Sequence, residues 1–266
     1  MAQFSAKLFH DGPLNVNIEK IDNSPSSPQL KKTHSRSPPA PTQLIKIPPS
    51  PIIPLLTDTH WEVNKLIHAS DNENLSTCLF DPVITEGIVR FEGIFENKNK
   101  WYFCIGIADP TAVYSPGTWP QTHENDKKSV RHEFWGSISH IEQGRIGQRN
   151  DMIEGNSSFK SGQRVGCEIN MSSNPRKAHF FVDGVEQPLS VFNIPPAVRF
   201  MAFLEEANCS FTVTRFESLT SSSVHGVPGS KQFEWGKQWK KDQENAFEEE
   251  LFGRQKDDLI NFVEGF

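Results

Sequence analysis

The sequence predicts an all-β domain in the middle of the chain, built as a two-sheet antiparallel β-sandwich. Three observations predict this fold class. Short runs rich in β-branched and aromatic residues follow one another, turn-forming Gly, Pro, Asn and Asp separate them, and no long helical pattern interrupts them. The predicted strands are residues 87–95, 101–108, 132–140, 164–171, 177–183, 198–204 and 209–216.

Several of these runs alternate apolar and polar residues, which is typical of a sheet with one buried face. In residues 164–171, Val165, Cys167 and Ile169 share one face, whereas Glu168 lies on the other. The pair Asp183-Gly184 follows an apolar run and predicts a tight hairpin, because such turns need residues that tolerate positive φ. We therefore expect a core on one side of each sheet and water on the other.

The segment before the predicted sandwich, residues 1–56, is rich in proline. It holds ten of the 19 prolines. Because Pro lacks the amide hydrogen that helices and central strands need, we expect a disordered segment with local polyproline II structure. Its PxxP runs could meet an SH3 or WW domain, but a plain linker is the favoured interpretation.

The sandwich itself is predicted to occupy residues 57–217, and two further segments follow it. A Ser- and Gly-rich linker takes residues 218–230. Residues 231–266 are charged, and Trp239 and Leu251 fit the spacing of an amphipathic helix. This helical tail either docks on the sandwich or binds a partner, and a weakly ordered tail is an equally good interpretation.

Composition excludes several classes of function. The net charge of the 266 residues is −6, which argues against binding to nucleic acid or to anionic membranes by bulk electrostatics. No run of 18 apolar residues is present, and the N-terminus lacks the pattern of a signal peptide. The four cysteines are far apart, so we expect buried, reduced thiols and a cytoplasmic location.

Catalytic and metal-binding patterns are not evident in the sequence. It has no Gly-x-Ser-x-Gly elbow, no phosphate-binding loop and no His-Glu-x-x-His motif. The nine histidines are scattered, and no His or Cys set has the spacing of metal ligands. We therefore expect no enzyme activity, no cofactor and no metal.

Several segments of the predicted domain resemble one known family, the SPRY domains. In chain order they are the strand pair 84–92 and 101–109, the aromatic-rich run 133–138, the run 162–170, the hairpin 179–184, and the closing strands 195–203 and 210–216. The resemblance implies a bent, concanavalin A-like sandwich that binds proteins without catalysis. It also implies that the ligand surface is formed by loops at one edge of the sandwich.

Two long loops could form such a surface. The loop from residue 109 to 131 carries Tyr114 and Trp119 among prolines, and Arg131 lies where it re-enters the sheet. The second loop carries Arg149. Aromatic side chains on a proline-stiffened loop lose little entropy on binding, so we predict that Tyr114, Trp119, Arg131 and Arg149 contact a partner. Alternatively Trp119 folds back onto the core, and Trp135 is expected to be a core residue.

The leading functional interpretation is an adaptor or scaffold that recognises a protein or peptide. The alternative is a carbohydrate-binding, lectin-like module, because lectins share this sandwich architecture. The sequence does not indicate the oligomeric state.

Overall fold

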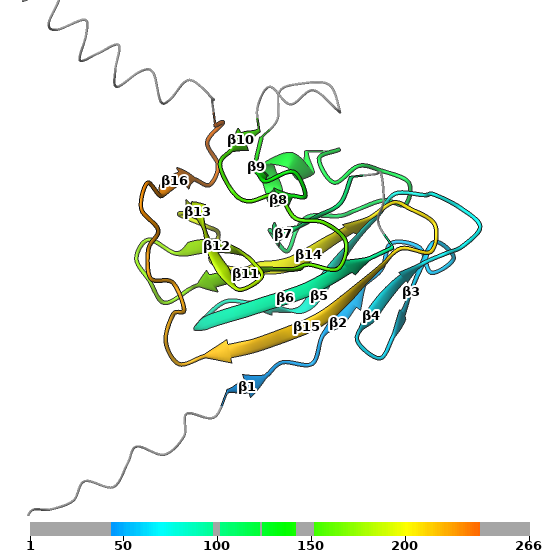
Figure 1. Cartoon of the computed structure of the whole chain (residues 1–266), viewed down its shortest axis with the longest axis horizontal. Helices are drawn as coiled ribbons and strands as arrows, with labels where there is room; N and C mark the ends of the chain where they lie inside the picture. The colour runs from blue at the N-terminus through cyan, green and yellow to red at the C-terminus, as the bar shows by residue number, and fades with distance from the viewer. Residues whose placement is uncertain (1–43, 98–101, 123, 142–151, 240–266) are drawn as a thin grey trace, which may run out of the picture. The chain divides into compact units, whose positions relative to one another are not determined.

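The computed structural model describes residues 44–97, 102–122, 124–141 and 152–239. Two sheets, antiparallel in all but one strand pair, face each other across one core (Figure 1). The all-β sandwich predicted from the sequence is confirmed. In sheet order, the nine-stranded sheet contains β16 (Lys231–Glu234), β13 (Val185–Phe192), β12 (Lys177–Val182), β11 (Arg164–Asn170), β6 (Ile88–Glu96), β15 (Ser210–Leu219), β4 (Lys65–His68) and β3 (Thr59–Glu62), with β1 (Ile45–Lys46) also paired to β15. The seven-stranded sheet contains β10 (Ile153–Glu154), β9 (Ser137–Ser139), β8 (Ser129–Glu133), β7 (Cys104–Ala108), β14 (Val198–Leu204), β5 (Ser76–Ile84) and β2 (Ser50–Ile52).

Phenylalanine rings join the two sheets. Phe91 on β6 and Phe200 on β14 are fully buried and stack with their centroids 4.9 Å apart. Phe216 on β15 meets both rings edge-on. Each fully buried Phe stabilises the fold by about 1.5–3 kcal/mol, so these rings contribute directly to holding the two layers together. The four cysteines are buried and form no disulfide, as expected.

The N-terminal boundary of the sandwich lies earlier than the sequence predicted. Residues 44–56, predicted to belong to the disordered segment, contain β1 and β2. Strand β2 includes Pro51 and lies at the end of the seven-stranded sheet, beside β5. Proline is tolerated there because an edge strand needs hydrogen bonds on one side only. Residues 1–43 lie outside the described residues, so their predicted disorder stays a prediction.

The predicted linker 218–230 is also part of the fold. Strand β15 continues to Leu219, and residues 220–230, here called the strap, cross the outer face of the nine-stranded sheet. Ser222 and Ser223 donate hydrogen bonds to the Glu168 carboxylate, and the Ser222 bond is 2.6 Å long. The prediction of a linker was wrong because the serine hydroxyls of this segment bind the carboxylate of Glu168 and so fix the segment on the sheet.

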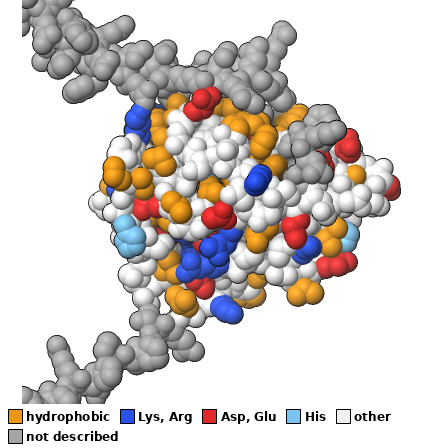
Figure 2. Space-filling view, viewed as in Figure 1, with side chains coloured by type: hydrophobic (Ala, Val, Ile, Leu, Met, Phe, Trp, Pro, Cys, Tyr) orange, Lys and Arg blue, Asp and Glu red, His pale blue; other side chains and the backbone are white. Residues whose placement is uncertain are grey.

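The strap explains why Glu168 is only 1% exposed, although the sequence predicted that it lies on the solvent-exposed face of the sheet. Beside it, the fully enclosed Arg90 lies 2.7 Å from Glu92 Oε1 and 3.5 Å from Glu168 Oε2. Its guanidinium carbon also lies 3.2 Å from the centre of the Phe181 ring. Buried charges need such compensation. On the surface, Figure 2 shows other basic and acidic side chains next to one another near the middle of the face in view.

The predicted helical tail begins as a strand. Strand β16 pairs in parallel with β13, and Trp239, just beyond it, is 1% exposed. His140 anchors this segment, since its Nδ1 lies 2.8 Å from the Ser129 carbonyl oxygen and its Nε2 accepts the Gly236 N–H at 2.8 Å. The start of the tail therefore docks on the sandwich as a strand and not as a helix, while residues 240–266 lie outside the described residues.

The hairpin between β3 and β4 contains a strained residue. Val63 at its tip has φ 57° and is 94% exposed. A left-handed backbone conformation costs an L-residue about 1–2 kcal/mol, whereas glycine adopts it freely. We expect Val63→Gly to raise the free energy of unfolding by up to about 1 kcal/mol, after the entropy that glycine adds to the unfolded chain. Thermal unfolding of both proteins tests this, and a lower melting temperature would contradict it.

His132 makes stability depend on pH. It is fully buried on β8 between the rings of Phe159 and Phe180, and burial lowers its pKa from 6.5 to about 3. Between these values the unfolded chain binds a proton and the folded chain does not. This residue's contribution to stability is therefore complete above pH 6.5 and is lost, by about 1.4 kcal/mol per pH unit, as the pH falls toward 3. Denaturant titrations at several pH values should show a shallower acid slope for His132→Leu; equal slopes would contradict this account.

Candidate partner-binding surface

The predicted binding loop packs on the outer face of the seven-stranded sheet. Its residues Ala112, Tyr114 and Trp119 meet a second, smaller apolar cluster on this face. The strand residues in that cluster are Leu79 on β5, Cys104 and Ala108 on β7, and Met201 and Phe203 on β14. Because one side of the loop is apolar, the sheet buries that side and leaves the other side to solvent.

Hydrogen bonds hold this loop in one conformation. The Gly117 N–H donates to the Leu75 carbonyl at 3.0 Å, and Asn125 Nδ2 donates to the Val113 carbonyl at 2.8 Å. Asn125 begins the 3-10 helix η1 (Asn125–Lys128) and is 2% exposed. The loop is thus shaped before any partner arrives, which lowers the entropy cost of binding.

Two of the four predicted contact residues are buried. Tyr114 is 8% exposed, its hydroxyl donates to Met201 Sδ at 3.7 Å, and burial raises its pKa to about 12. Arg131 is fully buried, with Nη1 donating to Ser129 Oγ at 3.0 Å and Nε 3.5 Å from Glu133 Oε1. The prediction of direct contact is corrected for both residues. They lie between the loop and the sheet, where they support the loop.

Trp119 is half-buried, which agrees in part with the alternative that it folds back onto the sandwich. Its ring stacks on Phe203 at 5.7 Å and meets Tyr102 edge-on at 5.7 Å. The rest of the indole remains open to solvent. A role as a binding anchor stays a prediction. Arg149 lies outside the described residues.

Trp119 belongs to a continuous group of half-buried rings. Tyr102 also contacts Trp135 at 5.3 Å, and Trp135 contacts Phe134 at 4.6 Å. Trp135 Nε1 donates to Ser137 Oγ at 2.6 Å, so its polar group is satisfied by the protein. We call Tyr102, Trp119, Phe134 and Trp135 the aromatic surface. Trp135, expected in the core, is half-buried instead.

Sequence reasoning missed Tyr102 and Phe134 as surface residues. Both were placed inside predicted strands, but β7 begins only at Cys104, and β8 ends at Glu133. The available signal was the pairing of aromatic residues, Trp101-Tyr102 before β7 and Phe134-Trp135 after β8, at two strand ends that lie next to each other in the sheet, where Cys104 pairs with Glu133. Such positions leave the regular alternation of the sheet and can turn a ring toward solvent.

The chemistry of this surface is apolar contact. Val113 on the same loop is 73% exposed and adds to the apolar area of that loop. Within the described ranges, no group of three or more His, Cys, Asp or Glu side chains could hold a metal ion. In the same ranges no helix is long and apolar enough to cross a membrane.

Comparison with known proteins gives likenesses of fold. No protein-family model and no curated protein sequence matches the chain. The SPRY domain of human HERC1 matches with a TM-score of 0.43 at 14% identity, covering 62% of this chain and 94% of that one. A second human SPRY domain matches with a TM-score of 0.44 at 14% identity, covering 62% and 97%. The PSpry domain of TRIM65 matches with a TM-score of 0.38 at 8% identity, covering 59% and 86%. The chain thus matches structures of SPRY domains over about 60% of its length. The SPRY domains are also the family that its sequence resembles.

Proposed function

We propose that this protein is a non-catalytic interaction module that recognises a segment of another protein through the aromatic surface. The observation that carries the proposal is the contiguity of four half-buried rings beside a loop fixed by hydrogen bonds. Trp and Tyr contribute much of the binding energy of protein interfaces, because they bury a large area and lose little side-chain conformational entropy. A role as a cytoplasmic adaptor or scaffold is part of the same proposal.

A buried neighbour of the aromatic surface supports this function. Phe203 is fully buried and contacts the rings of both Trp119 and Tyr102, which keeps these two rings in place. A preformed apolar surface of this kind gains most of its binding energy from desolvation of a few central side chains. We therefore expect Trp119 and Tyr102, which contact each other, to be the residues whose truncation weakens binding most.

Quantitative affinity capture from the native cell tests this function. The full chain is compared with Trp119→Ala and with the control Val63→Ala, which alters an exposed residue on the other sheet. We expect a defined set of proteins captured by the wild type and by the control, and reduced about tenfold or more with Trp119→Ala. Equal capture by all three proteins would contradict a role for the aromatic surface.

A further inference from the structure

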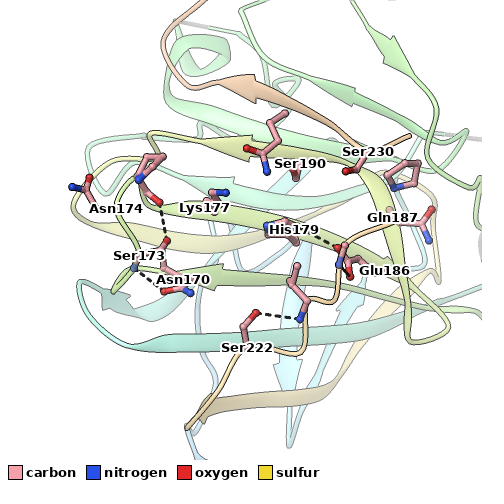
Figure 3. A pocket seen from close by; sticks show the side chains of 15 residues that line it. Asn170, Ser173, Asn174, Lys177, His179, Glu186, Gln187, Ser190, Ser222 and Ser230 are labelled. Carbon is pink, nitrogen blue, oxygen red and sulfur yellow. Dashed lines mark hydrogen bonds and ion pairs between the residues drawn. The ribbon is translucent and has the colours of Figure 1, made fainter. Parts of the chain in front are cut away.

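A second, chemically different pocket lies on the outer face of the nine-stranded sheet, between strands β11 to β13 and the strap. Its volume is about 370 Å³, which is at the small end of ligand pockets. Figure 3 shows Asn174 and Ser173 at one end, Glu186 and Gln187 at the other, and Lys177 and His179 between them. The pocket belongs to the opposite sheet from the aromatic surface, so it is an independent feature.

The walls of this pocket are held in place by the protein itself. Glu186 Oε2 accepts the backbone N–H groups of His225 and Gly226 at 2.7 and 3.1 Å. Its Oε1 lies 3.7 Å from His179 Nδ1. On the other side, Ser222 and Ser223 anchor the strap to Glu168. The cavity is therefore preformed, and the charge of Glu186 is already met by two backbone donors.

Lys177 contributes a positive charge that no described residue pairs. None of the ion pairs among the described residues includes its ammonium group, which lines the pocket from β12. Lys177 lies close enough to His179 to help burial lower the pKa of that imidazole. A half-buried lysine that forms no ion pair among the described residues favours an anionic group on whatever ligand enters the pocket.

The other uncommitted groups are amides and hydroxyls. Asn170 Oδ1 accepts the N–H groups of Ser172 and Ser173 at 3.1 and 2.9 Å, which leaves its amide N–H bonds for the pocket. The side chains of Asn174 and Gln232 make no hydrogen bond within the described part of the chain. Amides both donate and accept, so they suit hydroxyl groups, which do the same. An amino-acid zwitterion fits less well, because its ammonium group needs a carboxylate. The carboxylate of the pocket, Glu186, already accepts two backbone N–H groups of the strap.

We propose that this pocket binds an acidic saccharide unit, a hydroxylated ring that carries a carboxylate. The carboxylate pairs with Lys177, and the ring hydroxyls bond to the amides of Asn170, Asn174 and Gln232. The same chemistry is presented by a free sugar acid and by the acidic end of a glycan chain. Binding here does not depend on the protein-binding function of the aromatic surface.

Amide NMR spectra of the full chain test the proposal with defined probes. Glucuronate is titrated beside glucose, which lacks the charge, and acetate, which lacks the hydroxyls. We expect glucuronate to shift the amides of residues 177, 226 and 230 and to bind at least about tenfold more tightly than either control probe. A glucuronate-terminated disaccharide distinguishes the two sources, because tighter binding than free glucuronate indicates a glycan end.

Charge variants assign the effect to Lys177. Lys177→Gln should remove the preference for glucuronate over glucose, and Lys177→Arg should retain it because the positive charge stays. Lys160→Gln, which removes a charge from an exposed lysine on a different loop, is the matched control and should change nothing. The proposal is overturned if no probe shifts these amides, if the three probes bind equally, or if the Lys177→Gln and Lys160→Gln proteins behave alike.

Discussion

Trp239→Ala is expected to lower the free energy of unfolding by about 3–5 kcal/mol, one of the two largest effects that the structure predicts. The indole is 1% exposed and lies against Phe233 and His140, each with ring centroids 5.2 Å away. Its Nε1 donates to the Glu234 carbonyl at 2.8 Å. Removing the ring leaves a cavity and weakens the attachment of β16 to β13. Urea unfolding followed by fluorescence or circular dichroism measures the change.

A nearby substitution provides the control for Trp239. Lys237 is exposed, and Lys237→Ala should change stability by no more than about 0.5 kcal/mol. Trp239→Phe should recover much of the loss, because the ring contacts partly remain. If Trp239→Ala were as stable as Lys237→Ala, residues 231–239 would not belong to the folded domain.

Glu168→Ala is expected to have an effect of similar size, about 3–5 kcal/mol, because it removes one partner of a buried charge. Arg90 would keep only Glu92 as its close carboxylate among the described residues. Ser222 and Ser223 would lose the acceptor that fixes the strap. We expect increased hydrogen exchange in residues 220–230 together with the loss of stability, measured by mass spectrometry and denaturant unfolding.

The isosteric variant separates charge from shape at this position. Glu168→Gln keeps an acceptor for the strap serines but removes the charge that faces Arg90. It should therefore destabilise the protein while leaving the strap better protected than in Glu168→Ala. Exchange of the strap at the wild-type rate in Glu168→Ala would show that these hydrogen bonds do not hold it.

The strands with clear alternation were predictable because burial of one face leaves a period of two in the sequence. Residues 164–171 show this alternation and correspond closely to β11, and the apolar run 198–204 corresponds to β14. Strand β5 was missed because Asp81 and Pro82 interrupt its apolar residues, and proline is unfavourable in most strands. Strands β1 and β2 were missed because proline is unfavourable in most strands, and the sequence does not show that β2 lies at an edge.

The candidate site was predictable as a loop but not residue by residue. The length and aromatic content of residues 109–131 located the right region. Which ring faces the sheet depends on the path of the loop, and that path is set by long-range bonds such as the one from Gly117 to Leu75. Tyr114 therefore turned inward, while Trp119 stayed half-buried. The burial of Glu168 was equally hidden, because the strap that covers it comes from residues more than 50 positions later.

Site-specific photo-crosslinking in the native cell tests the central claim, that a partner protein occupies the aromatic surface, most directly. A photoreactive residue is placed at position 113, on the same loop as Trp119, or at position 63, on the other sheet; both native side chains are exposed. The account predicts a discrete protein adduct from position 113 that disappears when Trp119→Ala is added, and no such adduct from position 63. An adduct from position 63 alone, or one from position 113 that persists without Trp119, would contradict it.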